Sequence, residues 1–213
     1  MKIVLASGNK NKYREMKEEF LPLGIELLFG GDFENPPEIE ETGDTYRENA
    51  LLKARGWAEA VALPSMSDDS GLEVEVLGGV PGVHSARIIP GSDADRTAWL
   101  LQQMKDKKNR NARFVSCIAV VFPGKEEPLV CERCCPGTIA LKAAGMSGFG
   151  YDPIFIPTGY DKTFVELGDE VKKKISHRAL AIKGIAEKLM HVIQYSTVPT
   201  IDNSQPKEDE NPN

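Results

Sequence analysis

With 213 residues, of which 41% are hydrophobic and 27% charged, the chain has the size and balance of a soluble globular protein with one core or two lobes that share a sheet. No window approaches the ~18 apolar residues of a membrane span, and the chain enters an apolar strand without a charged-then-apolar leader, so we expect a cytoplasmic protein. The formal net charge of -6 disfavours a DNA or RNA partner, because nucleic acids favour an excess of Lys and Arg.

The first predicted elements are a strand and a helix joined by a polar turn. Residues 2–6, KIVLA, have the β-prone apolar character of a buried strand. Apolar residues from Tyr13 to Leu21 then recur at helical spacing, until Pro22 ends the pattern.

The polar turn, residues 7–12, reads SGNKNK. A helix N-terminus offers unpaired N–H groups and about half a positive charge, which suits a phosphate. Gly8 allows close backbone approach, Ser7 and Asn9 offer polar contacts, and Lys12 adds a charge. The turn is neither a Walker loop nor a G-x-G-x-x-G turn. Simple helix capping by Ser7 and Asn9 is the alternative interpretation.

The predicted elements that follow alternate between strands and helices, with glycine-rich loops between them. In chain order they are a strand at 25–29, an acidic loop at 30–44, a helix from Thr45 with a capping box to Glu48, a strand, charged turn and second strand at 64–77, a short helix at 95–104, a hairpin of strands 112–122 and 128–139, and a last helix from about Ser176 to Gln194. The mixture of βα units with a hairpin predicts an α/β fold with a mixed sheet.

Two acidic clusters suggest a metal site. Glu40 and Glu41 lie in a loop just ahead of a predicted helix, and Asp68 and Asp69 lie at a predicted strand end. Adjacent carboxylates repel one another unless a cation or a donor compensates them. Together the clusters would form an all-oxygen site for Mg²⁺, which prefers carboxylates plus substrate phosphates. A solvated acidic turn is the alternative for the aspartate pair.

A basic cluster and two aromatic residues suggest nucleotide binding. The segment KKKISHR, 172–178, places Ser176, His177 and Arg178 at the start of the last helix, where an anionic ligand would offset the unfavourable macrodipole. Phe149 and Tyr151, in a glycine-rich loop, suit stacking on a base, although core packing is the commoner fate of an aromatic residue.

Four cysteines, Cys117, Cys131, Cys134 and Cys135, include a C-x-x-C-C cluster. A zinc site usually needs two separated ligand pairs, and the sequence has no second pair, so reduced thiols packed in neighbouring strands are the favoured interpretation. The folded domain is expected to span 1–195. The polar, acidic segment 196–213 is expected to be a disordered tail.

Five ordered motifs resemble the inosine triphosphate pyrophosphatase family. They are SGNxxK, EETGxTxxENAxxKA, DDSGLEVxxLGGxPGxxSAR, GFGYDPIF and SHRAxA, between Ile3 and about Leu189. The resemblance implies an elongated central mixed sheet flanked by helices, two lobes with the active-site cleft between them, and a homodimer. It also implies hydrolysis of the purine nucleotides ITP, dITP and XTP to the monophosphate and pyrophosphate, with Mg²⁺ as cofactor. Two departures are His84, where many relatives carry an aromatic residue, and the acidic tail.

The resemblance implies roles for particular residues. Asp69 is expected to accept a proton from water and to bind the metal together with Glu41. The substrate-binding residues that it implies are Ser7, Gly8, Asn9, Lys10, Asn11, Lys12, Ser70, Phe149, Gly150, Tyr151, Asp152, Lys172, His177 and Arg178. Among these, Lys12 and the N–H groups of the first helix would stabilise the leaving pyrophosphate. Arg178 or a neutral His177 would donate to the C6 oxygen that distinguishes inosine and xanthine from adenine.

Two other function classes fit part of the pattern. A non-catalytic nucleotide sensor would use the same donors, but it would gain little from an acidic pair that repels triphosphate when metal is absent. A zinc-dependent structural protein would use the cysteines. Release of pyrophosphate from ITP in the presence of Mg²⁺ distinguishes the enzyme from both.

Overall fold

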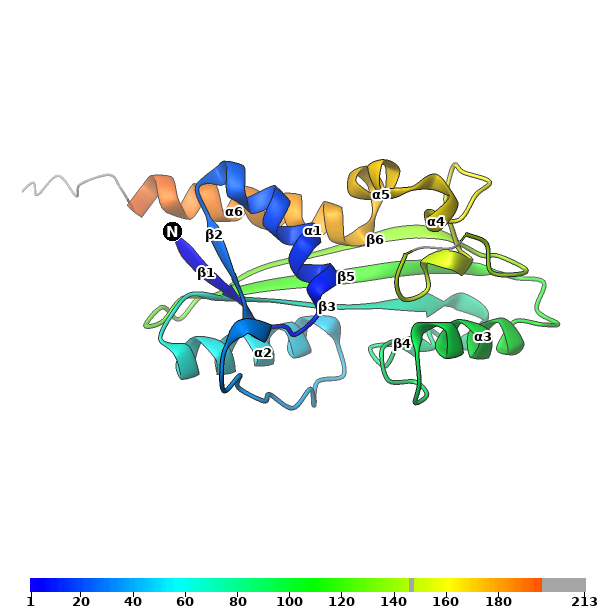
Figure 1. The fold of residues 1–213 in the computed structure, drawn as a ribbon, viewed down its shortest axis with the longest axis horizontal. Helices are drawn as coiled ribbons and strands as arrows, with labels where there is room; N and C mark the ends of the chain where they lie inside the picture. The colour runs from blue at the N-terminus through cyan, green and yellow to red at the C-terminus, as the bar shows by residue number, and fades with distance from the viewer. Residues whose placement is uncertain (146–147, 197–213) are drawn as a thin grey trace, which may run out of the picture.

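The computed structural model describes residues 1–145 and 148–196, which form an elongated α/β molecule around one long sheet (Figure 1). The strands are β1 Lys2–Leu5, β2 Glu26–Phe29, β3 Ser65–Val74, β4 Pro81–Gly82, β5 Asn111–Val121, β6 Leu129–Ile139 and β7 Phe155–Pro157. The helices are α1 Lys10–Phe20, α2 Tyr46–Val61, α3 Asp93–Gln103, α4 Phe164–Leu167, α5 Asp169–Ile175 and α6 His177–Ser196.

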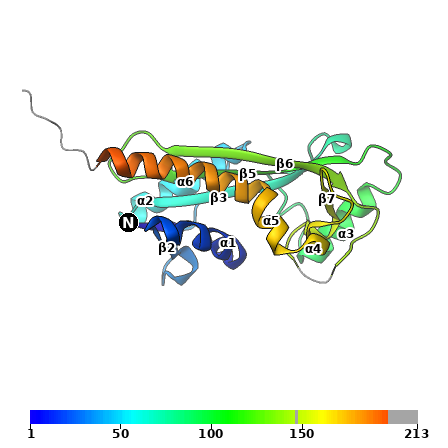
Figure 2. The ribbon, with the colours of Figure 1, turned by 90° about the horizontal axis from the view of Figure 1, so that it is seen from above.

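The seven strands form a mixed sheet, as the sequence predicted. The strand order is β2-β1-β3-β5-β6-β7, with β4 paired to β3. β1 runs parallel to β2 and β3, and the remaining pairs are antiparallel. Helices α1 and α6 lie on one face of the sheet and α2 on the other (Figures 1 and 2). The capping box between Thr45 and Glu48 and the β5–β6 hairpin are both confirmed.

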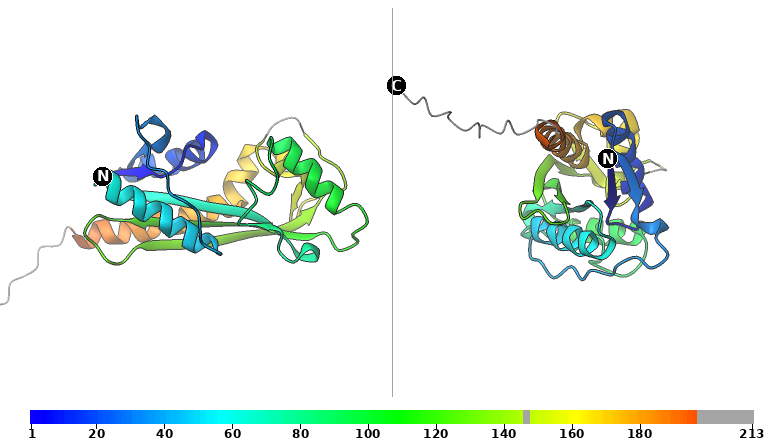
Figure 3. Two further views of the ribbon diagram at one scale, coloured as in Figure 1. Left: turned by 90° about the horizontal axis from the view of Figure 1, so that it is seen from below. Right: turned by 90° about the vertical axis from the view of Figure 1, so that its left-hand side faces the viewer.

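Two groups of buried side chains define two lobes on the shared sheet. Near the N-terminus, Leu5, Phe20, Ile118 and Leu189 belong to a core between the sheet, α1 and α6. At the other end, a second core is built around Phe114 and contains residues from α3, α4 and β7. Helices α2 and α3 lie toward opposite ends of the sheet, far apart along its length (Figure 3). The long strands β3, β5 and β6 run through both lobes and fix their relative position.

One edge of β3 opens between the two lobes. β5 pairs with β3 along its whole length. On the opposite edge β1 reaches only Ser65 and Met66, and β4 pairs only with Leu72 and Glu73. Among the described strands, none covers residues 67–71 on that edge. The SDDSG segment, residues 67–71, therefore lies at the junction of the lobes without a strand on that edge.

The structure corrects one predicted element. Residues 64–77 were expected to contain a charged turn, but Asp68 and Asp69 lie in the middle of the continuous strand β3. The strand tolerates them because successive side chains point to opposite faces, where each meets a cation. The last helix, α6, begins at His177, next to the start predicted near Ser176. Lys172 lies in the last turn of α5, where the macrodipole favours a cation.

The acidic tail expected from residue 196 falls outside the described residues from position 197 on. Within residues 1–145 and 148–196, no helix combines the length and the apolar content that crossing a membrane requires.

Candidate active site

Two adjoining cavities lie at the junction of the lobes, below the N-terminus of α1. The first, which we call the acidic cavity, is lined by Ser7, Gly8, Glu41, Lys53, Trp57 and Asp68, among others. The second, the aromatic cavity, is lined by Ser70, Phe149, Tyr151, Asp152, His177 and Arg178, among others. Asn9, Lys12 and Ala86 line both cavities. One ligand with a charged end and a flat end can therefore reach across Lys12 from one cavity to the other.

The SGNKNK turn caps α1 with its own side chains. Asn9 Oδ1 accepts hydrogen bonds from the N–H groups of Asn11 at 2.9 Å and Lys12 at 3.1 Å. Ser7 Oγ accepts from the N–H of Asn9 at 3.1 Å. Of the N–H groups that we expected to bind the leaving pyrophosphate, those of Asn11 and Lys12 are thus already paired. Lys10 is exposed and lines neither cavity, whereas the other five residues of the turn each line one or both.

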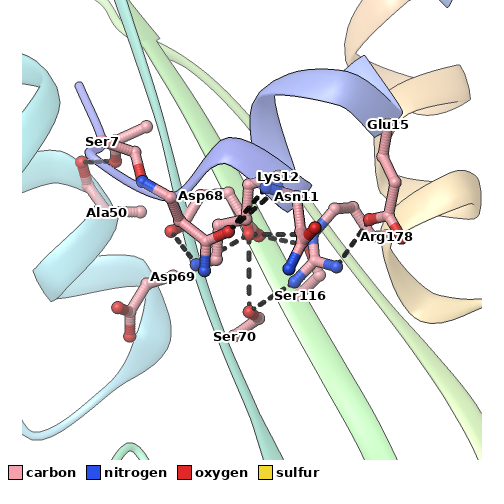
Figure 4. A network of polar contacts seen from close by, with 12 residues as sticks. Ser7, Asn11, Lys12, Glu15, Ala50, Asp68, Asp69, Ser70, Ser116 and Arg178 are labelled. Atoms are coloured by element: carbon pink, nitrogen blue, oxygen red, sulfur yellow. Dashed lines mark hydrogen bonds and ion pairs between the residues drawn. The ribbon is translucent and has the colours of Figure 1, made fainter. Parts of the chain in front are cut away.

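Asp68 is the centre of a buried network of donors (Figure 4). Its carboxylate accepts hydrogen bonds from Lys12 Nζ at 2.9 Å, Arg178 Nε at 3.0 Å and Ser116 Oγ at 2.6 Å. Burial opposes ionisation, but the charges of Lys12 and Arg178 outweigh it and hold the pKa of Asp68 far below the usual carboxyl range. Asp68 is therefore a permanent anion that fixes Lys12 and Arg178.

Asp69 points away from this network (Figure 4). It is bound by Lys53 of α2. Lys53 Nζ lies 2.8 Å from Asp69 Oδ1 and 2.6 Å from Glu41 Oε1, and Arg87 also pairs with Glu41. Burial raises the pKa of Asp69, and Lys53 opposes the rise. Its second oxygen, Oδ2, is buried without a hydrogen-bond partner. An unpaired carboxylate oxygen of raised basicity suits a proton acceptor or a ligand for a cation.

Phe149 lies over two cations at the wall of the aromatic cavity. The Nζ of Lys172 is 4.2 Å from the centroid of its ring, and the guanidinium carbon of Arg178 is 5.4 Å away. Lys172 is held by Asp152 at 2.7 Å and by Glu15 at 3.1 Å. One face of the phenyl ring remains against the two cations, and the opposite face of the ring can stack on a base.

Arg178 is occupied by the protein itself. Besides its bond to Asp68, it donates to Glu15 Oε2 at 2.7 Å and to Ser70 Oγ at 2.9 Å. Burial opposes the charge of Glu15, but Arg178 and Lys172 lower the pKa of that carboxyl. These contacts tie α1, β3 and α6 together. They leave Arg178 few donors for a ligand.

His177 begins α6 and stacks on Phe114, with ring centroids 4.6 Å apart and an interplanar angle of 10°. It lines the aromatic cavity, and its buried Nδ1 has no hydrogen-bond partner. Burial, followed by the charge of Arg178, lowers the pKa of His177 well below its usual value. The imidazole is therefore neutral, and it can either donate to a ligand or accept from it.

Sequence reasoning missed Glu15, Lys53, Ser116 and Asp93, whose contacts hold the predicted residues in place. A signal existed for Lys53. Lys53 lies on the helix face that carries the buried Ala50, Ala54 and Trp57, and a cation on an apolar face needs a partner. Ser116 could not be found from spacing, because its register opposite β3 appears only in the folded sheet.

The cysteines form no cluster. All four thiols are free; Cys117, Cys131 and Cys135 are buried, and Cys134 is exposed. In the part of the chain that the structure describes, no three His, Cys, Asp or Glu side chains come close enough together to hold a metal by themselves.

Residues 3–188 match the family profile of the Ham1 family. The chain belongs to the Ham1 family. It is 43% identical to the dITP/XTP pyrophosphatase of Symbiobacterium thermophilum over 91% of this chain and 97% of that protein. It is 44% identical to the dITP/XTP pyrophosphatase of Escherichia coli over 88% of this chain and 98% of that protein.

Solved Ham1 structures show the same fold. The Ham1 protein of Staphylococcus aureus is 36% identical and superposes with a TM-score of 0.81, over 90% of this chain and all of that one. The nucleoside-triphosphatase, or dITP/XTP pyrophosphatase, of Mycobacterium abscessus is 43% identical, with a TM-score of 0.71 over 87% of this chain and 98% of that one. The resemblance to inosine triphosphate pyrophosphatases and the α/β fold expected from it are confirmed.

Proposed function

We propose that this Ham1 protein hydrolyses the non-standard purine nucleotides dITP, ITP and XTP to the monophosphate and pyrophosphate. The relatives from Symbiobacterium thermophilum and Escherichia coli are dITP/XTP pyrophosphatases, and the match with this chain covers 97% and 98% of their length. The observation that carries the proposal is the buried, unpaired Oδ2 of Asp69, whose other oxygen is bound by Lys53 of the acidic cavity. A non-catalytic nucleotide sensor would have no use for such an atom.

The donor set fits Mg²⁺. Two carboxylates, Asp69 and Glu41, converge on Lys53, and Asp69 Oδ2 retains its free lone pairs. Mg²⁺ takes one or two carboxylates together with substrate phosphates, so this pair would hold it. Bound there, Mg²⁺ would neutralise the charge that builds on the phosphates.

The side chains of the cleft divide the chemistry between them. Asp69 is the proton acceptor for the water that attacks the α-phosphorus, because its pKa is raised and one oxygen is free. Asp68 cannot serve, since its pKa is held low and its oxygens already accept from four side chains, Lys12, Ser70, Ser116 and Arg178. Lys12 and Lys53 place positive charge beside the triphosphate.

The aromatic cavity is where the base is held. Phe149 stacks on the purine, and Nδ1 of neutral His177 offers a hydrogen bond to its edge. With its proton on Nδ1, the neutral imidazole donates to the C6 oxygen of inosine or xanthine, whereas the C6 amino group of adenine opposes this donor with a donor; the selectivity therefore requires that His177 keeps the Nδ1–H tautomer. Arg178, which we also expected to read this edge, is bound to Asp68, Glu15 and Ser70 and supports the wall of the cavity.

An isotope experiment tests the site of attack. Hydrolysis of ITP in H₂¹⁸O is expected to place the label in the monophosphate and none in pyrophosphate, because water attacks the α-phosphorus. Label in pyrophosphate or in inorganic phosphate would contradict the proposal. The use of Mg²⁺, the homodimer and the cytoplasmic location remain predictions from the sequence.

A further inference from the structure

The loop that carries Phe149 is held from the far side by the first turns of α3. The N–H of Gly150 donates to Asp93 Oδ2 at 2.7 Å, and Thr97 Oγ1 donates to the carbonyl of Gly150 at 3.3 Å. Both backbone polar groups of one loop residue are therefore bound to α3. Gly150 has a φ of 62°, a conformation that favours glycine, so the loop has a defined turn at this point.

Asp93 is itself held in place for this contact. Its other oxygen, Oδ1, accepts from Arg96 at 2.6 Å, and Arg96 also donates to the carbonyl of Gly91 at 2.7 Å. Burial opposes ionisation, but the N–H of Gly150 and the guanidinium of Arg96 lower the pKa of Asp93. A charged acceptor makes a stronger hydrogen bond than a neutral one. Asp93 and Arg96 both line the aromatic cavity, on the wall formed by α3.

Phe149 depends on this anchor for its position. Its own backbone makes two long bonds to Asp152: the N–H donates to Oδ2 at 3.4 Å, and the carbonyl accepts from the N–H of Asp152 at 3.4 Å. The ring rests on Lys172. Contacts with a cation fix the distance of a ring but only loosely its tilt. The orientation of the ring therefore depends on the backbone of the neighbouring Gly150.

We propose that Asp93 is a positioning residue for base recognition, which acts by fixing Gly150 so that Phe149 is preorganised to stack on the purine. The inference rests on the proposed function, in which the aromatic cavity takes the base. Asp93 should therefore matter for ligands that carry a base and not for pyrophosphate, which has none.

The test compares Asp93→Ala with Asp95→Ala in the full chain. Asp95 belongs to the same helical turn and forms the capping box with Ser92, but within the described residues it has no hydrogen bond to Gly150, so it controls for loss of charge and capping in α3. Affinities for IMP and for pyrophosphate would be measured by calorimetry. We expect Asp93→Ala to weaken the binding of IMP about tenfold, which is the effect of losing one hydrogen bond to a charged group. The affinity for pyrophosphate should be unchanged. Asp95→Ala should leave both affinities unchanged.

A double-mutant cycle with Phe149→Ala shows whether Asp93 acts through the ring. In the Phe149→Ala background, Asp93→Ala should cause no further loss of IMP affinity. As a single substitution, Asp93→Asn, which keeps one acceptor, should retain part of the IMP affinity that Asp93→Ala loses. Should Asp93→Ala fold poorly, Thr97→Val, which removes the second contact to Gly150, is expected to weaken IMP alone. The inference is overturned if Asp95→Ala weakens IMP binding as much as Asp93→Ala does, or if Asp93→Ala weakens pyrophosphate binding to the same degree as IMP binding. It is also overturned if Asp93→Ala still weakens IMP binding in the Phe149→Ala background.

A measurement without ligand separates this inference from the proposed function. Amide exchange at Gly150 should be faster in Asp93→Ala than in wild type, and unchanged in Asp95→Ala. If wild type binds no IMP, the proposed function is wrong, while the exchange data still report on the anchor. If wild type binds IMP and Asp93→Ala binds it equally well, the inference is wrong and the function stands.

Discussion

Asp68 and Asp69 are neighbours in the sequence, but their carboxylates lie on opposite faces of β3 and are compensated by different cations. Asp68 binds Lys12 and Arg178 on the face of α1 and α6, and Asp69 binds Lys53 on the face of α2. The alternation of a strand thus separates a carboxylate that holds the site together from one that is free to react. The two positions can be tested against each other.

Replacement of Asp69 by Asn is expected to remove turnover while leaving nucleotide binding and folding largely intact. The variant loses the proton acceptor and one charge but keeps the shape of the side chain, and loss of a general base costs about 10² to 10⁴-fold. Single-turnover kinetics and ITP affinity, measured together, check this. A variant that keeps more than about a tenth of wild-type kcat would show that Asp69 is not the base.

The same substitution at Asp68 is expected to act on stability first. It leaves the buried cations Lys12 and Arg178 without their shared partner, and breaking a buried ion pair costs about 3 kcal/mol or more in the free energy of unfolding. Glu26→Gln is the control, because its pair with Lys2 is exposed and should contribute little. Denaturant titration of both variants is the measurement. Equal free energies of unfolding for the Asp68→Asn and Glu26→Gln variants would contradict a structural role for Asp68.

His177 is expected to make the protein less stable as pH falls. Its pKa in the folded state is well below the value of about 6.5 in the unfolded chain, so below that pH the unfolded chain takes up a proton that the folded protein does not. His177→Phe keeps a ring against Phe114 and removes the proton site. Between about pH 7.5 and 5.5 the free energy of unfolding of wild type should fall by about 1 kcal/mol more than that of His177→Phe. Parallel pH curves would show that His177 titrates normally in the folded state.

Lys12 and Lys10 offer a matched pair in the first turn of α1. Lys12 lines both cavities, whereas Lys10 is exposed and lines neither. Lys12→Ala should therefore weaken ITP far more than IMP, because the lysine faces the departing phosphates, and Lys10→Ala should change neither affinity. Calorimetry with the two ligands gives the ratio. An equal loss for ITP and IMP in Lys12→Ala would place the lysine away from the pyrophosphate.

The sequence predicted most elements of the fold but only part of the site. Local signals sufficed where the determinant is local, as in the capping box of Thr45 and the helical spacing that ends at Pro22. The charged turn predicted at Asp68 was wrong, because its compensating cations, Lys12 and Arg178, lie 56 and 110 residues away in the chain. Glu15 was missed for the same reason: its partner Arg178 is brought to it only by the packing of α1 and α6 on the sheet. Lys53 carried a local signal, its place on the apolar face of α2, but its partner Asp69 is identified only in the folded sheet.

The most direct test of the proposed reaction is a panel of nucleoside triphosphates, assayed with Mg²⁺ for pyrophosphate and for inorganic phosphate in the same samples. ITP, dITP and XTP are expected to yield pyrophosphate and monophosphate in equal amounts with no inorganic phosphate. ATP is expected to react with a kcat/KM at least about 10²-fold lower, because its C6 amino group is a mismatched donor in a buried site. GTP shares the C6 oxygen of ITP, so its rejection requires that its C2 amino group meets another donor or a wall without an acceptor. Release of inorganic phosphate with a nucleoside diphosphate, or equal rates for ATP and ITP, would contradict this function.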